Sequence, residues 1–191
     1  LEWRPVYWLT GDKASGKSTF QDMIKHLNGG DKGLIQSNDP TKSGITSRLG
    51  HSSLPVSIDE LEPGDEGSNK ERDIIVLARV AASGGQWLRG SADQKGASGN
   101  VFSTFLFSSI LIPGAMKPQD RSRLITLNLD TLAKDAPKLS LDPRTWRKRG
   151  ARLKQLLIGR WPSWDARLQL WREALAEAGL TAKVVGDAHG S

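Results

Sequence analysis

This 191-residue sequence predicts an α/β fold in which a mainly parallel five-stranded sheet lies between helices, with a small helical region at the C-terminus. Short apolar, β-prone runs alternate with segments of helical periodicity, and this alternation is typical of a parallel sheet. A glycine-rich turn joins the first run to the first helix. The composition changes near residue 130, so we expect an α/β core over 1–130 and a basic, tryptophan-rich helical region over 131–191.

The expected elements follow from periodicity and from helix-ending glycines. The five expected strands are Val6–Thr10, Leu34–Ser37, Leu54–Ile58, one within Val101–Ile112, and Leu124–Leu129. The expected helices are 17–27, Thr41–Leu49, and one of about four turns that begins at the capping pair Ser68 and Glu71. Two short segments, Gln86–Ser91 and Asn100–Ser103, flank a Gly/Ser-rich stretch and predict a hairpin.

The composition describes an ordinary globular chain, with 37% hydrophobic and 25% charged residues. No run approaches the roughly 18 apolar residues of a membrane span, and without cysteine there is no disulfide framework. We therefore expect a cytoplasmic protein without a membrane partner. The net charge of +6 arises in residues 131–191, because residues 1–130 carry 15 basic and 15 acidic side chains. The chain begins at Leu1 without Met, and we expect it to be a piece of a longer protein.

The turn after the first strand satisfies the pattern G-x-x-x-x-G-K-[ST] at every position. Its glycines let backbone N–H groups wrap around a phosphate, and the following helix directs its positive end at the same anion. Lys17 then reaches the β and γ oxygens, and the Ser18 hydroxyl binds Mg²⁺. The sequence thus predicts a P-loop NTPase that binds ATP and Mg²⁺ through Gly11, Asp12, Lys13, Ala14, Ser15, Gly16, Lys17, Ser18 and Thr19.

Two adjacent carboxylates, Asp59 and Glu60, directly follow the third apolar strand. At a strand end beside a phosphate loop, Asp59 would hold Mg²⁺ through water and Glu60 would act as the general base for the attacking water. The alternative is a solvated acidic turn. The second acid favours a hydrolysing enzyme over a kinase.

Polar residues near the last two strands are further candidates. Ser108 and Ser109 end the fourth strand, where a polar side chain can sense the γ-phosphate, although serines are common at strand ends. Arg121 and Arg123 precede the fifth strand, where an arginine can stabilise transition-state charge at the site of a neighbouring subunit. The alternative is a surface charge cluster or a pairing of Asp120 with one of these arginines.

Residues 6–130 resemble the ATPase domain of phage and prophage primase-helicases, in the superfamily-3-like group of AAA+ proteins. The resemblance rests on the ordered segments TGDKASGKST, IQSNDPTKSGITSRLG, PVSIDELE, ASGG, RGSADQKG, FLFSSI and DRSR. It implies an ATP-driven helicase that assembles as a homo-oligomeric ring, a hexamer, on single-stranded DNA. In such rings a hairpin inserted at this point grips DNA, which makes Arg89 and Lys95 the candidate contacts here; a plain surface loop is the alternative. The family usually carries Asn where this chain has Ser108 and Ser109.

The C-terminal region combines a basic run around Trp146 with a helical apolar face that includes Trp164 and Trp171. We expect a helical lid or bundle that packs on the core with its tryptophans buried; a nucleic-acid-binding arm is the alternative. Two other functions stay open. One is a small-molecule P-loop kinase in which Arg121 and Arg123 belong to a lid that closes in cis, and the other is a non-motor NTP-dependent switch.

Overall fold

The sheet is built as the sequence predicts. The computed structural model describes residues 4–61, 69–89, 97–112, 116, 121, 123–133, 135–136 and 142–178. Its five-stranded sheet consists of β1 (Val6–Thr10), β2 (Ile35–Ser37), β3 (Val56–Ile58), β6 (Phe105–Ser109) and β7 (Leu124–Asn128). The strand order is β2-β3-β6-β1-β7, and every neighbouring pair is parallel. The carboxyl ends of β1, β3 and β6 therefore meet at one edge.

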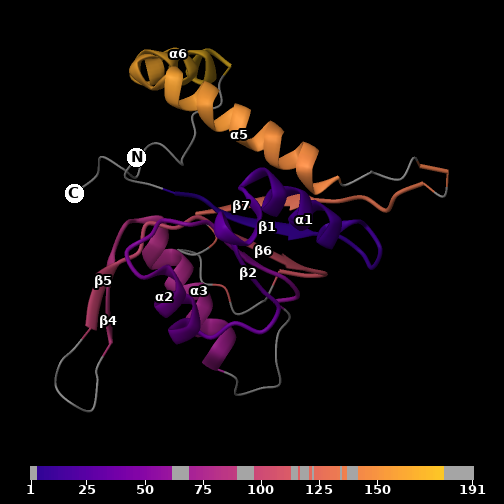
Figure 1. The fold of residues 1–191 in the computed structure, drawn as a ribbon, viewed down its shortest axis with the longest axis vertical. Coiled ribbons are helices and arrows are strands. Elements are labelled where there is room, and N and C mark those ends of the chain that lie inside the picture. The colour runs from indigo at the N-terminus through magenta and orange to yellow at the C-terminus, as the bar shows by residue number, and fades with distance from the viewer. Residues whose placement is uncertain are drawn as a thin grey trace.

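Helices cover both faces of this sheet (Figure 1). They are α1 (Lys17–Leu27), α2 (Lys42–Leu49) and α3 (Asn69–Ala82). The connection from β1 to β2 crosses the sheet in one direction, and the connections from β2 to β3 and from β3 to β6 return in the other. Because such crossovers are right-handed, α1 lies on one face while α2 and α3 lie on the opposite face. The expected helices are confirmed, and Ser68 of the expected cap lies outside the described residues.

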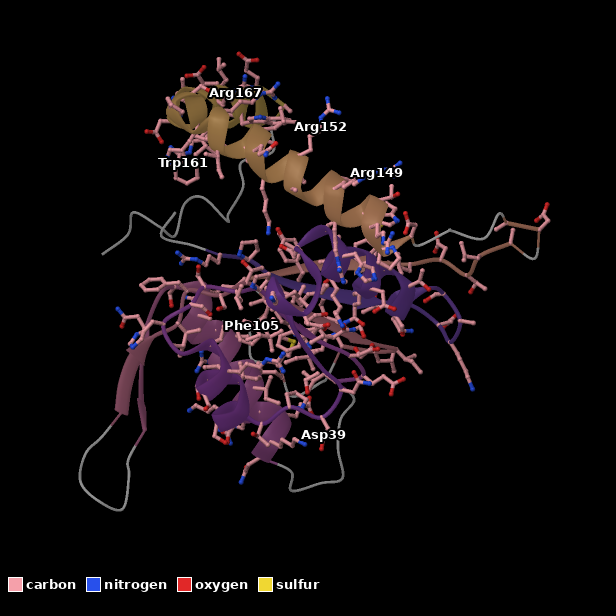
Figure 2. All side chains as sticks on the ribbon, in the orientation of Figure 1. Asp39, Phe105, Arg149, Arg152, Trp161 and Arg167 are labelled. Atoms are coloured by element: carbon pink, nitrogen blue, oxygen red, sulfur yellow. The ribbon has the colours of Figure 1, made fainter. Side chains whose placement is uncertain are left out.

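The core lies between the sheet and α3. Trp8, Phe105 and Phe107 are fully buried, and the ring centroids of Trp8 and Phe107 are 4.8 Å apart. Figure 2 places Phe105 in the middle of the molecule. Ile74 and Leu77 of α3 are also buried in this cluster, at the positions that the helical spacing predicts. Close packing of these large side chains holds the strands and thereby the loops at their carboxyl ends.

The hairpin is present with a shifted second strand. β4 (Gln86–Arg89) pairs antiparallel with β5 (Ala97–Asn100), with Gln86 opposite Asn100. The expectation that the second strand covers Asn100–Ser103 is therefore wrong by about three residues. Ala97–Gly99 belongs to the strand although its small residues have low β propensity, because the register set at Gln86 brings them opposite β4.

The C-terminal region forms two helices, α5 (Pro143–Gly159) and α6 (Trp164–Glu177), which follow one another through a short 3₁₀ turn. Gly150 of α5 is buried against the end of α1, where an added Cβ would lie 1.8 Å from the Leu27 carbonyl oxygen. Only α5 makes this contact, and α6 lies farther from the sheet (Figure 1). None of the described helices is long and apolar enough to cross a membrane.

The expectation that the tail buries its tryptophans is wrong. Trp161 and Trp171 are each 68% exposed, and no residue of α6 is buried. Close approach of α5 to α1 needs a residue without a side chain, so Gly150 rather than the indoles makes the contact. Ser163 precedes α6, but its hydroxyl donates to the Arg160 carbonyl oxygen and caps no backbone N–H of the helix.

Candidate nucleotide site

The loop between β1 and α1 needs glycine at two positions for different reasons. A Cβ on Gly11 would lie 2.6 Å from both the Leu129 carbonyl oxygen and the Ser15 hydroxyl, closer than any real contact. Gly16 has a φ of 90°, in the left-handed region that side chains disfavour, and immediately precedes the first residue of α1. The two glycines therefore allow the chain to turn tightly enough that the amino end of α1 faces the space enclosed by the loop.

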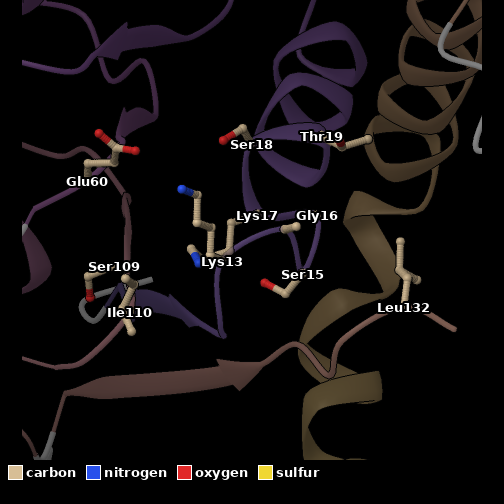
Figure 3. Close-up of a pocket in the computed structure, with 11 residues that line it drawn as sticks. Lys13, Ser15, Gly16, Lys17, Ser18, Thr19, Glu60, Ser109, Ile110 and Leu132 are labelled. Carbon is tan, nitrogen blue, oxygen red and sulfur yellow. The ribbon is translucent and has the colours of Figure 1, made fainter. Parts of the chain in front are cut away.

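That space is a pocket of about 540 Å³ (Figure 3). It is lined by residues 13–19 of the loop and helix start, and also by Glu60, Ser109, Ile110 and Leu132. Lys17 reaches back across the loop, where its Nζ donates to the carbonyl oxygens of Gly11 at 2.5 Å and Asp12 at 3.0 Å. An ammonium group and the positive end of a helix thus share one pocket, which suits it to a multiply charged anion.

Ser18 and Asp59 are brought together from positions 41 residues apart in the sequence. The Ser18 hydroxyl donates to Asp59 Oδ2 at 3.3 Å. Gln21, one turn further along α1, is fully buried and donates to the Ile58 carbonyl oxygen at 3.2 Å. This second bond holds α1 against the end of β3, so the register of Ser18 and Asp59 is fixed by the fold.

Ser108 occupies the gap between β1 and β3, because β6 lies between those strands. Its hydroxyl donates to Asp59 Oδ1 and accepts from the backbone N–H of Glu60 at 3.4 Å. Glu60 has a φ of 54°, and Ala14 at 66° is the other non-glycine residue with positive φ in the described chain. Both line the pocket. Residues with such strained backbones persist only where the surrounding structure holds them, and they are concentrated at functional sites.

Ser109 is committed to the core despite lining the pocket. Its hydroxyl accepts from the Trp8 indole N–H at 2.7 Å and donates to the Leu111 carbonyl oxygen at 2.7 Å. A serine has one hydroxyl proton, so neither Ser108 nor Ser109 has a proton free for a phosphate oxygen in this arrangement. The residues expected to sense the γ-phosphate thus lie at the site but are engaged with Asp59 and with the core.

Arg123 lies at the edge of the sheet opposite to the pocket. β7 starts beside Val6 and ends beside Thr10, so five residues, roughly 16 Å, separate Arg123 from the loop. Its guanidinium donates to the Arg79 carbonyl oxygen at 3.3 Å and to the Ser83 hydroxyl at 3.5 Å. Arg121 is exposed near this edge. Neither arginine lines the pocket of its own chain.

The suspected nucleic-acid contacts are placed only in part. Arg89 is the last residue of β4, paired with Ala97, and lies on the hairpin away from the pocket. Lys95 falls outside the described residues, as do residues 117–120, which include Asp120.

Sequence reasoning did not select the apolar side of the pocket. Ile110 and Leu132 line it while being 46% and 63% exposed. It also did not select Asn128, which ends β7 beside the loop and accepts a hydrogen bond from the Thr10 hydroxyl. Apolar residues in strand-end loops carry no motif, so only the assembled pocket identifies them. The Asn at the end of the fifth strand was a polar signal that could have been used.

The residues fit a nucleoside triphosphate with magnesium. The donor set near Asp59 is a hydroxyl and a carboxylate, the oxygen ligands that Mg²⁺ takes from proteins when phosphates and waters supply the rest. The Ser15 hydroxyl is buried in the loop and has no hydrogen-bond partner among the described residues. Such an unpaired buried group is costly unless a ligand satisfies it.

Comparison with known proteins adds little to this geometry. No known family model matches the chain, and no curated protein matches it. Solved structures of the NrS-1 C-terminal region in apo form are similar, at 17%, 16% and 14% identity, with TM-scores of 0.46, 0.44 and 0.46. Each similarity covers 76% of this chain and 33–35% of that structure. The chain thus spans about a third of the length of the structures it matches.

Proposed function

We propose that the chain is an AAA+-like P-loop ATPase domain that hydrolyses ATP to drive a helicase or translocase along single-stranded DNA, in phage-type DNA replication. The observation that carries the proposal is the 3.3 Å contact between Asp59 and Ser18, which lines the pocket together with Lys17 and Glu60. A phosphate loop, a magnesium-binding hydroxyl and two acids thereby share one site. This combination is what phosphoryl transfer to water requires.

The residues then divide the work. The loop N–H groups and Lys17 would bind the phosphates, and Ser18 and Asp59 would hold Mg²⁺, directly and through water respectively. When bound, magnesium supplies charge neutralisation to the β and γ phosphoryl oxygens. Glu60 would accept the proton of the attacking water. The backbone of Glu60 is strained, and its N–H donates hydrogen bonds to Asp59 Oδ1 and to the Ser108 hydroxyl. These constraints favour one position of the Glu60 carboxylate over the pocket.

The strand order supports a hydrolase of the additional-strand type over a kinase. β6 separates the strand of the phosphate loop from the strand of the acids, which leaves room between them for the γ-phosphate and a water. In a kinase, Arg121 and Arg123 would have to close over the pocket in cis. Arg123 lies at the other end of β7 and is bonded to α3, so that lid does not fit this chain.

A ring assembly would complete the site. An arginine from an adjacent subunit would approach the γ-phosphate, and the β4–β5 hairpin with Arg89 and Lys95 would face DNA in the central channel. The number of subunits, six by the family resemblance, belongs to the proposal.

The test is Glu60→Gln, measured beside the wild type for ATP binding and for ATP hydrolysis with and without single-stranded DNA. We expect binding to stay and hydrolysis to fall by a factor of roughly 10² or more, because only the base is removed. Wild-type turnover in this variant would refute Glu60 as the base. Phosphorylation of a small acceptor, with a rate indifferent to DNA, would instead identify a kinase, and tight binding with slow hydrolysis in the wild type would identify a switch.

A further inference from the structure

Helix α5 carries a one-sided charge. Of its 17 residues, six are Lys or Arg and none is Asp or Glu. Like charges three and four residues apart repel one another and destabilise an isolated helix. A helix that needs only solubility usually mixes both signs. The six cations of α5 are therefore expected to contact other groups, either within the protein or in a partner.

Two of the six are used by the fold. Lys154 Nζ donates to the Asn28 carbonyl oxygen at 3.0 Å, and the Arg147 guanidinium lies against Gly30. Both flank Gly150 on the side of α5 that packs on the carboxyl end of α1. Cations there interact favourably with the helix dipole of α1. These contacts explain Arg147 and Lys154 in the docking of α5 on α1, whereas Arg149 stacks on the Trp146 ring within α5 itself.

Two of the four remaining cations of α5, Lys148 and Arg152, face away from α1. Lys148 and Arg152 lie two residues to either side of Gly150, about 200° around the helix and hence on the opposite side. Figure 2 shows Arg149 and Arg152 of α5 and Arg167 of α6 along one edge of the two helices, away from the sheet. All four side chains are exposed, and none forms an ion pair with any described residue. We call Lys148, Arg149, Arg152 and Arg167 the basic row.

A polyanion is the partner that this surface fits. The phosphate backbone of a nucleic acid would supply the missing counter-charges and release its own bound cations, whatever its base sequence. A membrane surface would also need apolar side chains in the plane of the cations. In Figure 2, however, Trp161 lies on the other edge of the helices from Arg152. A phosphate backbone needs no such apolar plane.

We propose that the basic row binds the phosphate backbone of nucleic acid, as a contact surface separate from the nucleotide pocket and from the β4–β5 hairpin. The basic row would be a second DNA contact of the proposed motor, in addition to the β4–β5 hairpin, and to this extent the inference rests on the proposed function. The charge distribution that supports it does not depend on ATP hydrolysis.

The test measures binding of a fluorescent oligothymidylate to the full chain by anisotropy, without nucleotide, over a range of salt concentrations. The variant combines Lys148→Gln, Arg149→Gln, Arg152→Gln and Arg167→Gln. Each lost phosphate contact reduces the magnitude of the negative slope of log K against log salt by about 0.7. We therefore expect this magnitude to decrease by about 2 to 3 and the affinity at low salt to fall more than tenfold. A duplex of equal length tells whether the row prefers one form of nucleic acid.

The control removes the same charge outside the basic row, through Lys42→Gln and Arg48→Gln in α2, Arg72→Gln in α3 and Lys32→Gln in the 3₁₀ turn after α1. Both variants reduce the formal net charge from +6 to +2. Equal slopes for the two variants would overturn the proposal, because net charge alone would then explain binding. So would unchanged DNA binding in the row variant together with loss of self-association or of binding to anionic vesicles.

Arg149 stacks on Trp146 and Arg167 Nε donates to Ser163, so the fourfold variant can disturb the helices. The pair Lys148→Gln and Arg152→Gln touches neither contact and should lower the slope by about 1.4. An unchanged salt dependence of DNA binding in this double variant would refute nucleic-acid binding by the basic row. The two proposals fail separately: wild-type hydrolysis in Glu60→Gln refutes the ATPase mechanism and leaves the row standing, whereas equal salt slopes refute the row alone.

Discussion

The hydroxyl of Ser108 donates a hydrogen bond to Asp59, and both residues stand at the carboxyl ends of neighbouring strands. The other oxygen of the same carboxylate accepts from Ser18. Asp59 is thus held from two sides, by the fourth strand of the core and by the first helix. Ser108 acts on the site through Asp59 instead of touching the nucleotide, which makes it a positioning residue in the proposed mechanism.

We predict that Ser108→Ala raises the Mg²⁺ concentration needed for half-maximal ATP hydrolysis about tenfold, because Asp59, which holds the ion through water in the proposed mechanism, loses the partner that orients its carboxylate. The measurement is a magnesium titration of the hydrolysis rate. Ser109→Ala is the matched comparison, since it removes the partner of the buried Trp8 indole and should lower the free energy of unfolding by about 1–3 kcal/mol. If both variants shifted the magnesium midpoint alike, Ser108 would have no special link to Asp59.

The backbone at Glu60 makes a separate prediction about stability. A non-glycine residue at a φ of 54° costs about 1–2 kcal/mol, and glycine avoids that cost. The free energy of unfolding of Glu60→Gly should therefore be at least as high as that of Glu60→Ala, although glycine is the less stabilising residue at most other positions. Urea unfolding of the two variants decides this, and a clear advantage for alanine would show that the backbone changes conformation. Both variants should lose hydrolysis.

The sequence predicted most of the core because its signals are local. Alternating apolar runs located the five strands, and the glycine pattern located the loop that Lys17 and Ser18 complete. The helices of the tail were predicted, but the burial of its tryptophans was mispredicted, because periodicity shows that a helix has an apolar face but not what covers that face. One contact that holds α5, Gly150 on the Leu27 carbonyl, involves no side chain and leaves no apolar pattern. The roles of Ser108 and Ser109 also required the structure, since only the register decides which serine faces Asp59 and which faces Trp8.

The arginines before β7 can be tested by mixing subunits. Arg121 is exposed and Arg123 is bonded to the end of α3, so Arg121→Ala should keep the stability of the wild type while Arg123→Ala lowers it. If one of them acts in trans, its alanine variant should lose hydrolysis by about 10³-fold or more. Mixing that inactive variant with Glu60→Gln should restore part of the rate, because intact arginines and intact bases then meet at some interfaces. No recovery at any ratio would count against action in trans.

The hydrogen bonds of Asp142 make the stability of the first turn of α5 depend on pH. Its carboxylate accepts from the Thr145 hydroxyl and from the backbone N–H groups of Thr145 and Arg144, and these bonds lower its pKa below the usual 3.8. The folded group therefore binds protons less readily than the unfolded one, so its stabilising effect is complete above about pH 4 and is lost as the pH falls through the folded pKa. We expect amide exchange at Arg144 and Thr145 to accelerate in that range. Asp142→Asn keeps an N-cap acceptor and should remove this pH dependence.

Two glycines of α5 offer the sharpest test of how the tail meets the core. Replacing a glycine within a helix by alanine normally stabilises it by about 0.5–1 kcal/mol. Gly159→Ala should follow this rule, because nothing lies within 4 Å of the added Cβ. Gly150→Ala should do the reverse and cost about 1–3 kcal/mol or more, since its Cβ would lie 1.8 Å from the Leu27 carbonyl oxygen and push α5 away from α1. Thermal unfolding of both variants measures the difference. Equal stabilisation by the two alanines would mean that α5 does not dock on α1 in solution, and Arg147 and Lys154 would then join the exposed cations of the helix.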